Sequence, residues 1–348
     1  MRVGLVCPYD LGRPGGVQDQ VIRLSGWLRD AGHDVVVVGP GTEGPLGAVL
    51  LGATTVITAN RSTAPIRLDP RIGRELSRTL AGCDVIHVHE PLMPVVSPAA
   101  LRVGGPAKVA TFHADPSTWV RRLYRAGRAG VRMALRGASV VTATSPVSGS
   151  SIDGVVEYRV VPNGIEVADH STGPKDPSRV AFLGRDDERK GLSVLLDAWP
   201  AVREAVPGAT LHVMGAERGE RHAGVEFLAR VDEDVKRAEL AAAAVFCAPN
   251  LGGESFGITV AEAMASACAV VASSIPAFQH VAGPAALFAE PGDAEHLARQ
   301  LGRALAEPAV ARELGNAALD RVAAFDGKTV TAAFVRAYED AIAPRSYP

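Results

Sequence analysis

The sequence predicts an α/β protein made of two Rossmann-like, doubly wound domains with a cleft between them. Short apolar runs alternate with segments of helical spacing along the 348 residues, and this alternation is typical of βαβ units that build a parallel sheet. The length suits two domains of ordinary size. The interval Glu166–Ser178 contains Gly, Pro, Asp and Ser and few apolar residues, which indicates a linker between the two.

The expected strands are short apolar runs. In the first half they are Val3–Cys7, Val35–Val38, Val85–Val88, Val109–Thr111 and Val140–Ala143. In the second half they are Val180–Leu183, Leu211–Met214, Val245–Ala248 and Val270–Ala272. Helices are expected between them, among them Gln18–Asp30, Leu192–Ala205, Val235–Ala243 and Ala294–Ala306. Because such sheets bind ligands beyond the carboxyl ends of their strands, residues that follow strands are the candidate site.

Composition and charge narrow the class of protein. The formal net charge of −2 gives no sign of a nucleic-acid partner, and none is expected. No apolar run approaches the ~18 residues of a transmembrane helix, and Met1–Val6 does not have the form of a signal peptide. All four cysteines lie in apolar contexts and lack the spacing of metal ligands. We therefore expect them to be core residues of a cytoplasmic protein.

The segment Gly252–Gly257, with the sequence GGESFG, is the most informative part of the chain. It follows a predicted strand, and the spacing predicts a helix over Glu254–Ala265. Free N–H groups and the helix dipole at a helix start favour a phosphate ligand. Glu254 and Glu262 would share one helix face roughly, where their carboxylates would bind sugar and ribose hydroxyls. The alternative is a pair of solvated glutamates after a turn.

Two further segments follow predicted strands. Gly15 and Gly16 open the helix after the first strand, and glycine allows the backbone to approach a ligand closely. A plain turn is the alternative there. Arg185 and Lys190 come directly after the strand Val180–Leu183. Two fixed cations at this place would neutralise a leaving diphosphate, as a metal does elsewhere, whereas the alternative is a solvated charged loop.

Histidines also stand at predicted strand ends. His113 follows the strand Val109–Thr111 and is expected to point toward the site; a hydrogen-bonded structural histidine is the alternative. His87 and His89 with Glu90 look like a metal cluster, but His87 and His89 face one side of a strand only, and no third ligand is evident on that side. No metal site is predicted.

The segment Ser117–Arg136 predicts a basic amphipathic helix. At 100° per residue its arginines fall on one side: Arg121, Arg122, Arg125, Arg128, Arg132 and Arg136. The apolar residues take the opposite side: Trp119, Val120, Leu123, Tyr124, Val131, Ala134 and Leu135. Such a helix suits the surface of an anionic membrane. The alternative is a helix packed on the core with a solvated arginine face.

Taken together, these motifs resemble glycosyltransferase family 4, whose fold is GT-B, and the similarity is greatest to the actinobacterial phosphatidylinositol mannosyltransferases. It extends over nearly the whole chain. The segments that carry it are Pro8–Gln18, His87–Pro91, Thr111–His113, Val161–Gly164, Phe182–Arg185, Arg189–Gly191 and Cys247–Ile258.

The resemblance implies a fold and a reaction. Residues 1–168 would form an acceptor domain to which a last helix, about 330–348, returns, and residues 169–329 a nucleotide-sugar domain. Mannose would pass from GDP-mannose to phosphatidylinositol at the cytoplasmic face of the membrane, without a metal or other cofactor and with retained configuration. The alternatives are another nucleotide sugar, another lipid or soluble acceptor, or a protein that binds a nucleotide sugar without turnover.

The resemblance also implies roles for individual residues of the donor site. The diphosphate would lie against Gly16, Arg185, Arg189 and Lys190. The nucleobase would lie near Val231, Asp232 and Lys236, and the ribose near Glu262. Sugar and phosphate would contact Glu254, Ser255, Phe256, Gly257 and Ile258. His113 would lie at the sugar and assist catalysis together with Glu254, Arg185 and Lys190.

On the acceptor side the resemblance points to three residues and one departure. Tyr9, Gln18 and Asn60 would face the inositol phosphate. Pro65 stands where the relatives carry an arginine for the acceptor's phosphate, so Arg61 or Arg67 would have to take its place.

Overall fold

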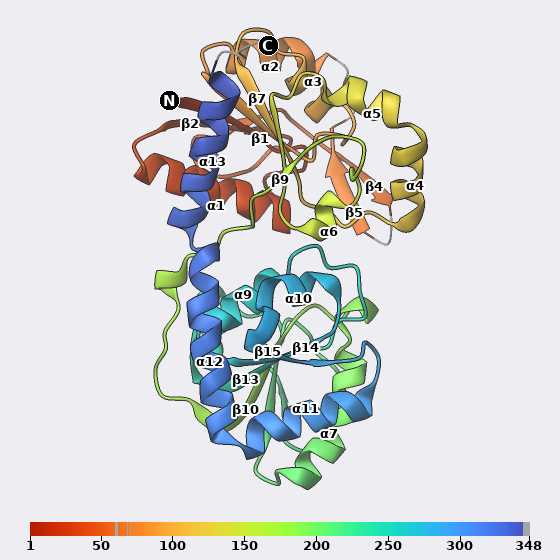
Figure 1. The fold of residues 1–348 in the computed structure, drawn as a ribbon, viewed down its shortest axis with the longest axis vertical. Coiled ribbons are helices and arrows are strands. Elements are labelled where there is room, and N and C mark those ends of the chain that lie inside the picture. Colours follow the sequence, from red (N-terminus) through yellow and green to blue (C-terminus); the bar gives the residue numbers. More distant parts are fainter. Residues whose placement is uncertain (60–61, 68, 70, 344–348) are drawn as a thin grey trace. The chain divides into compact units, whose positions relative to one another are not determined.

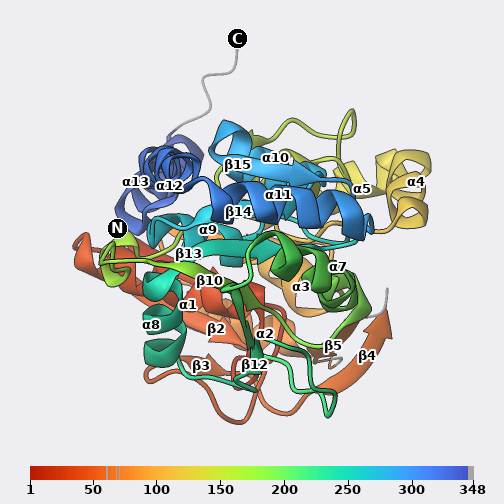
Figure 2. The same ribbon diagram turned by 90° about the horizontal axis from the view of Figure 1, so that it is seen from below.

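The structure, a computed structural model, describes residues 1–59, 62–67, 69 and 71–343. The chain forms two compact units, Met1–Gly164 with Gly327–Pro348, and Ile165–Asp326. Each unit is a sheet with helices on both faces (Figures 1 and 2). Ile165 is fully buried in the core of the second unit and forms a β-bridge with Asp326. The chain therefore leaves and re-enters the first unit a few residues before the boundaries expected from the sequence.

The first unit contains a seven-stranded sheet in the order β3-β2-β1-β6-β7-β8-β9, with all neighbours parallel. The strands are β1 (Arg2–Val6), β2 (Asp34–Gly39), β3 (Val49–Leu50), β6 (Val85–His89), β7 (Ala107–Phe112), β8 (Val140–Ala143) and β9 (Arg159–Val160). A separate antiparallel pair is formed by β4 (Thr55–Ala59) and β5 (Ser62–Ile66). All five strands predicted for this half are confirmed, with small shifts of their ends.

Helices cover both faces of this sheet because its residues alternate between two cores. The helices are α1 (Gly16–Asp30), α2 (Ile72–Leu80), α3 (Val96–Leu101), α4 (Thr118–Ala126), α5 (Arg128–Leu135), α6 (Pro146–Gly149) and α13 (Gly327–Ile342). Val3 and Leu5 pack with α1 and α13, where Tyr338 is fully buried. Ile86 and Val88 pack with α2, α3 and α5 on the opposite face. The last helix thus belongs to the first unit.

The second unit contains a six-stranded parallel sheet in the order β12-β11-β10-β13-β14-β15. Its strands are β10 (Asp176–Leu183), β11 (Thr210–Met214), β12 (Val225–Phe227), β13 (Ala243–Ala248), β14 (Ala269–Ser273) and β15 (Ala286–Ala289). The second sheet has the doubly wound order 3-2-1-4-5-6, and the first has the same order with a seventh strand, β9, added at its edge. Strand order therefore reverses between β1 and β6 in one unit and between β10 and β13 in the other. Ligands bind outside the carboxyl ends of the strands at such points.

The helices of the second unit also form two layers. They are α7 (Leu192–Ala205), α8 (Glu233–Ala242), α9 (Ile258–Ala265), α10 (Pro276–Ala282), α11 (Ala294–Ala306) and α12 (Pro308–Val322). Short 3₁₀ helices are η1 (Val167–Asp169), η2 (Glu188–Lys190), η3 (Gly283–Ala285) and η4 (Ala323–Phe325). Residues of α7 and α11 share one core, and residues of α9, α10 and α12 share the other. The interval predicted as a linker contains η1 and the start of β10, inside this unit.

Two predicted helices are wrong in extent. The helix expected over Glu254–Ala265 begins only at Ile258, because Gly252, Gly253 and Gly257 take positive φ values of 146°, 67° and 102°, a conformation that glycine adopts readily. Glu254 therefore lies on a loop and does not share a helix face with Glu262.

The single helix expected over Ser117–Arg136 is two helices, α4 and α5, which meet at Gly127. The N–H group of Gly127 closes α4 on the carbonyl of Leu123 at 2.8 Å. Glycine is a poor helix former, so the chain breaks there.

Candidate active site

In the second unit, the loops after β10 and β13 carry the predicted donor residues and are joined by an ion pair. Lys190 Nζ lies 2.8 Å from Glu254 Oε2, and Asn250 donates to the same oxygen at 3.2 Å. The side chains of Lys190 and Glu254 are 24% and 22% exposed, so both remain accessible to a ligand. Gly191 makes this contact possible: its φ is 70°, and a Cβ there would lie 1.9 Å from the Pro249 carbonyl oxygen.

The two other predicted cations of this loop differ in their surroundings. Arg185 is exposed directly after β10. Arg189 binds Asp187, with Nη2 at 2.8 Å and Nε at 3.2 Å. These hydrogen bonds lower the pKa of the Asp187 carboxyl to about 2. The positive charge of Arg189 is thus already balanced by Asp187, whereas the Arg185 side chain is exposed to solvent.

A second ion pair lies between α8 and α9. Lys236 Nζ is 2.9 Å from Glu262 Oε1 and 2.8 Å from Glu233 Oε2. Glu262 is 3% exposed, so its carboxylate depends on a cation for compensation. Asp232 caps α8 by accepting the N–H of Val235 at 2.9 Å. The residues expected near the nucleobase are therefore adjacent to the one expected at the ribose; Val231 itself packs partly buried against the core.

The residues between Glu254 and Glu262 offer a ligand backbone groups more than side chains. Phe256 is 1% exposed and packs edge-on against Phe325 at 5.3 Å, which makes its side chain part of the core. Gly257 precedes α9 without a side-chain cap. The N–H groups at Ile258 and beyond have no partner inside the helix. The free N–H groups of the helix start therefore lie at Ile258 and beyond, at the end of the segment Glu254–Ile258 that the resemblance assigned to sugar and phosphate.

In the first unit, His113 follows β7, and hydrogen bonds hold both its ring and its backbone. Its Nε2 lies 2.8 Å from Nδ1 of His89, and its side chain also bonds that of Asn163. Its backbone N–H donates to Glu90 Oε1 at 2.7 Å. Burial lowers the pKa of His113 to about 4, since the charged form is disfavoured away from water. The imidazole is consequently neutral at neutral pH.

His87 belongs to a separate buried network. Its Nδ1 lies 2.8 Å from the Tyr338 hydroxyl and its Nε2 2.5 Å from Oγ1 of Thr111. In the part of the chain that the structure describes, no three His, Cys, Asp or Glu side chains are grouped for a metal ion. Through its two hydrogen bonds, His87 links β6 to α13 and β7.

The predicted acceptor residues of the first unit are only partly brought together. Tyr9 forms a β-bridge with Ile66. Gln18 is buried and donates to the Asp10 carbonyl at 3.3 Å. Arg67 pairs with Asp69 at 2.9 Å. Gly16 is exposed at the start of α1 with open space in front of it. Asn60 and Arg61 lie outside the described residues.

The surface of α4 is both apolar and basic. None of its nine residues, all of them described, is buried, and Trp119 and Leu123 are 61% and 56% exposed. The core-packing alternative is therefore wrong for these two side chains. Arg122 and Arg125 are exposed on α4, whereas Arg121 pairs with Asp115. On α5 and directly after it, the exposed arginines are Arg128, Arg132 and Arg136. Of the helices that the structure describes, none combines the length and apolar character needed to span a bilayer.

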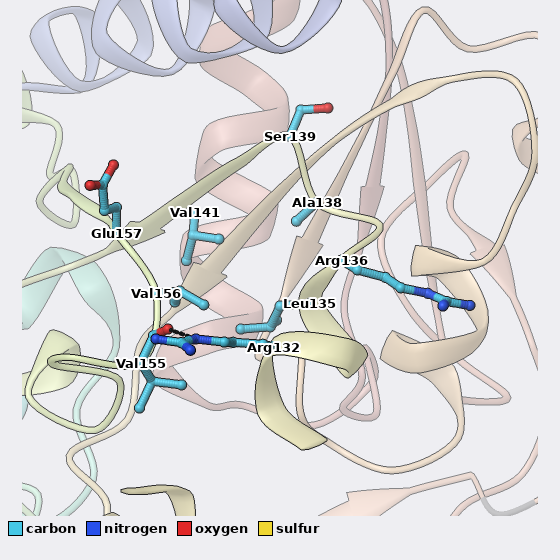
Figure 3. A pocket seen from close by; sticks show the side chains of 9 residues that line it. All are labelled: Arg132, Leu135, Arg136, Ala138, Ser139, Val141, Val155, Val156 and Glu157. Carbon is cyan, nitrogen blue, oxygen red and sulfur yellow. Dashed lines mark hydrogen bonds between the residues drawn. The ribbon is translucent and has the colours of Figure 1, made fainter. Parts of the chain in front are cut away.

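A pocket of about 400 Å³ lies beside α5, and Arg132 and Arg136 are among its lining residues (Figure 3). Its lining is Arg132, Leu135, Arg136, Ala138, Ser139, Val141, Val155, Val156 and Glu157. Arg132 bonds the Val155 carbonyl at 2.7 Å, and Arg136 points away from the other lining side chains. Ala138 and Ser139 precede β8, so the pocket is at the amino end of that strand. It includes none of the residues predicted for donor or acceptor.

Several residues of this geometry were not predicted as site residues. Asn250, Asp187, Asn163, His89 and Glu90 all contact a predicted residue directly. A signal existed for four of them. Asn163 lies in the Val161–Gly164 motif, His89 and Glu90 lie in the His87–Pro91 motif, and Asn250 lies in the Cys247–Ile258 motif. Their partners, however, come from distant segments, and sequence spacing does not reveal such contacts.

Comparisons with known proteins give a consistent result. The family model Glycosyltransferase Family 4 matches residues 14–169, and the model Glycosyl transferases group 1 matches residues 177–307. The phosphatidyl-myo-inositol mannosyltransferase of Mycolicibacterium smegmatis is 34% identical, covering 97% of this chain and 94% of its own. The enzyme of that name from Propionibacterium freudenreichii is 35% identical, covering 88% and 87%.

Solved structures show the same fold. The Anabaena protein HepE, in complex with UDP and glucose, has a TM-score of 0.75 at 19% identity, and the match covers 97% of this chain and 99% of that one. At this identity the likeness concerns the fold alone. The two doubly wound units are those of the GT-B fold, as the sequence resemblance implied.

Proposed function

The chain belongs to glycosyltransferase family 4, and from this premise we propose that it transfers mannose from GDP-mannose to phosphatidylinositol at the cytoplasmic face of the membrane. The names of the similar enzymes support the sugar and the acceptor. The observation that carries the proposal is the accessible Lys190–Glu254 ion pair beyond the carboxyl ends of β10 and β13, because it offers a cation for a diphosphate beside a carboxylate for a sugar.

The proposed reaction begins with an exchange of partners. Lys190 leaves Glu254 for a diphosphate oxygen, and Glu254 then accepts a hydrogen bond from a sugar hydroxyl. Arg185, exposed directly after β10, adds positive charge where negative charge grows as the sugar–phosphate bond breaks. Glu262, buried against Lys236, accepts from the ribose hydroxyls.

Bond formation then follows on the face that the leaving group vacates. The acceptor oxygen bonds the anomeric carbon, the bond to the diphosphate breaks, and the departing phosphate oxygen takes the acceptor proton. This route retains configuration and needs no general base on the protein. It suits the neutral His113, whose depressed pKa makes the ring a hydrogen-bonding group and not a charged acid.

The membrane contact is assigned to α4. Trp119 and Leu123 expose apolar area while Arg122 and Arg125 expose positive charge on the same short helix. Apolar side chains beside arginines suit the boundary between acyl chains and anionic headgroups. The acceptor would thus be reached from the lipid surface.

The ion pair provides the test of this proposal. Glu254→Ala should abolish mannose transfer and leave Lys190 free, so that GDP binding is retained or strengthened. Glu313→Ala, which removes an exposed carboxylate from α12, is the matched control and should transfer at the wild-type rate. Transfer rates and GDP titrations decide the matter: normal transfer by Glu254→Ala would remove Glu254 from the site.

A second candidate keeps the chemistry and changes the substrates. Arg67 is already paired with Asp69, and Pro65 stands where an acceptor-binding arginine is expected; both favour an acceptor other than phosphatidylinositol. The UDP and glucose complex of HepE likewise makes UDP-sugars the first alternative donors. Competition between GDP and UDP for the wild-type protein separates the two donors. A protein that binds either nucleotide without transferring any sugar would be a binding protein only.

A further inference from the structure

We propose that His89 and Glu90 are positioning residues that together fix His113, one through its ring and the other through its backbone. The inference rests on the proposed function only where it concerns turnover. The contacts themselves lie within one unit and involve described residues throughout. They join the end of β6 to the first residue after β7.

The ring of His113 is held by hydrogen bonds on two sides. His89 Nδ1 is 2.8 Å from His113 Nε2, and the two ring centroids are 5.0 Å apart. Asn163 bonds the His113 side chain as well. His89 and His113 are 1% and 6% exposed, so water does not compete for these bonds. The ring therefore has one orientation set by its neighbours.

The contact couples the proton positions of the two rings. One of the two facing nitrogens, Nδ1 of His89 or Nε2 of His113, donates and the other accepts, because a neutral imidazole has one donor and one acceptor. The other ring nitrogen of His89, Nε2, is buried and has no hydrogen-bond partner among the described residues.

The backbone of His113 is held by Glu90. Oε1 of Glu90 accepts the N–H groups of His113 and Ala114, each at 2.7 Å. Glu90 has a φ of 47°, which is uncommon for a residue other than glycine. Its own N–H donates to the Thr111 carbonyl at 2.8 Å. This turn directs the carboxylate across to the adjacent strand end.

These contacts differ from those of a merely structural polar core. The nearby network of His87, Thr111 and Tyr338 is equally buried but makes no hydrogen bond to His113. His87 only stacks on His89, at a centroid distance of 4.1 Å. The chain thus offers a matched pair: one network that touches His113 and one that does not.

Kinetics of four variants test the ring contact. His89→Phe should lower kcat by roughly 10- to 100-fold, the scale of misplacement by about 1 Å, and leave the donor KM unchanged. His89→Asn, whose amide nitrogen takes the place of Nδ1, should recover most of the loss. Tyr338→Phe removes one buried hydrogen bond from the other network and should keep the wild-type kcat. Glu90→Ala should resemble His89→Phe.

Two kinetic results would overturn the proposal. One is an equal loss of kcat in Tyr338→Phe and His89→Phe, because the histidine would then act through general stability. The other is wild-type kcat in both His89→Phe and Glu90→Ala.

A spectroscopic measurement separates this inference from the proposed function. In the full-length protein with ¹⁵N-labelled histidine, one of the two facing nitrogens, His89 Nδ1 or His113 Nε2, should be protonated and the other unprotonated at neutral pH. His89→Phe should shift the Nε2 signal, and Tyr338→Phe should not. An unchanged His113 signal in His89→Phe sinks the inference. If wild-type protein fails to transfer mannose while the signals respond as expected, the proposed function fails and the positioning contacts stand.

Discussion

His113 shows how surroundings decide the chemistry of a single residue. An exposed histidine has a pKa of ~6.5 and changes charge near neutral pH. Burial of His113 lowers its pKa to about 4, because the charged form is disfavoured away from water. A histidine in this state serves to orient and to hydrogen-bond.

This state predicts the pH dependence of turnover. Because the lowered pKa keeps His113 neutral at every pH well above 4, its titration should leave no inflection in kcat between pH 5.5 and 8. The measurement is kcat against pH for wild type and His113→Asn, with saturating donor. We expect His113→Asn to have a much lower kcat and nearly unchanged GDP affinity. An inflection near pH 6.5 that disappears in His113→Asn would contradict the assignment.

At the scale of residues, the sequence indicated which types gather at strand ends but not how they pair. Lys190 and Glu254 are 64 positions apart, and no local pattern predicts their ion pair. The sequence also gave no sign that Asp187 balances Arg189, because acidic residues in a loop are usually solvated. The pairing of Lys190 with Glu254 depends on where two loops meet, which the strand order fixes.

At the scale of elements, glycines explain the two wrong helix predictions. Apolar spacing continues through Gly127 and through the segment before Ile258, so periodicity alone extends both helices too far. Backbone conformation ends them: φ is positive at Gly257, and α4 closes at Gly127. The regular strands were predicted well because buried parallel strands are continuous apolar runs. Six strands of the described part of the chain were missed: β3, β4, β5, β9, β12 and β15. Of these, β3, β9 and β12 are only two or three residues long, too short for a run to stand out.

The broken basic helix leads to a prediction for membrane binding. Replacing Arg122, Arg125 and Arg128 by Ser should weaken binding to anionic vesicles, since each exposed arginine near such a surface contributes about 1 kcal/mol. Co-sedimentation with phosphatidylinositol-containing vesicles at low and physiological salt measures the effect.

A matched control comes from the second unit. Arg299, Arg303 and Arg312 are exposed on α11 and α12, and replacing them by Ser changes the net charge by the same amount. Equal loss of vesicle binding in both triple variants would mean that overall charge, and not α4, is responsible.

At the scale of the whole molecule, the chain passes between its units twice, and both crossings involve glycine. A Cβ on Gly164 or Gly327 would lie 2.5 Å or 2.3 Å from the Trp27 ring. Gln20 in addition bonds both the N–H and the carbonyl of Gly164, at 2.9 Å and 3.0 Å. Residues of α1 thus contact both connections at the points where the chain leaves and re-enters the first unit. The sequence indicated two domains, but these anchoring contacts depend on segments more than a hundred residues apart.

The buried histidines predict how stability changes with pH. Burial lowers the pKa of His87 to about 3 and that of His113 to about 4, whereas the unfolded chain binds these protons near pH 6.5. Their stabilising effect is therefore complete above pH 6.5 and is lost as pH falls, by up to ~1.4 kcal/mol per pH unit for each histidine. At pH 5 these two histidines together should lower the free energy of unfolding by roughly 4 kcal/mol.

Urea unfolding at pH 7.5 and pH 5 measures this loss. Glutamine does not titrate, so His87→Gln should remove the contribution of one histidine from the loss of unfolding free energy between pH 7.5 and pH 5. The opposing effect of Glu90, whose pKa burial raises, is common to both proteins and cancels in the comparison. Identical pH dependence in wild type and His87→Gln would show that His87 is not a buried neutral histidine.

The most direct test of the account is transfer itself. The full-length protein is incubated with radiolabelled GDP-mannose and phosphatidylinositol vesicles, and label is counted in the organic phase, with Glu254→Ala as the inactive reference. We predict label in the lipid for wild type and none for Glu254→Ala. Absence of label in wild-type samples that still bind GDP would contradict phosphatidylinositol as the acceptor.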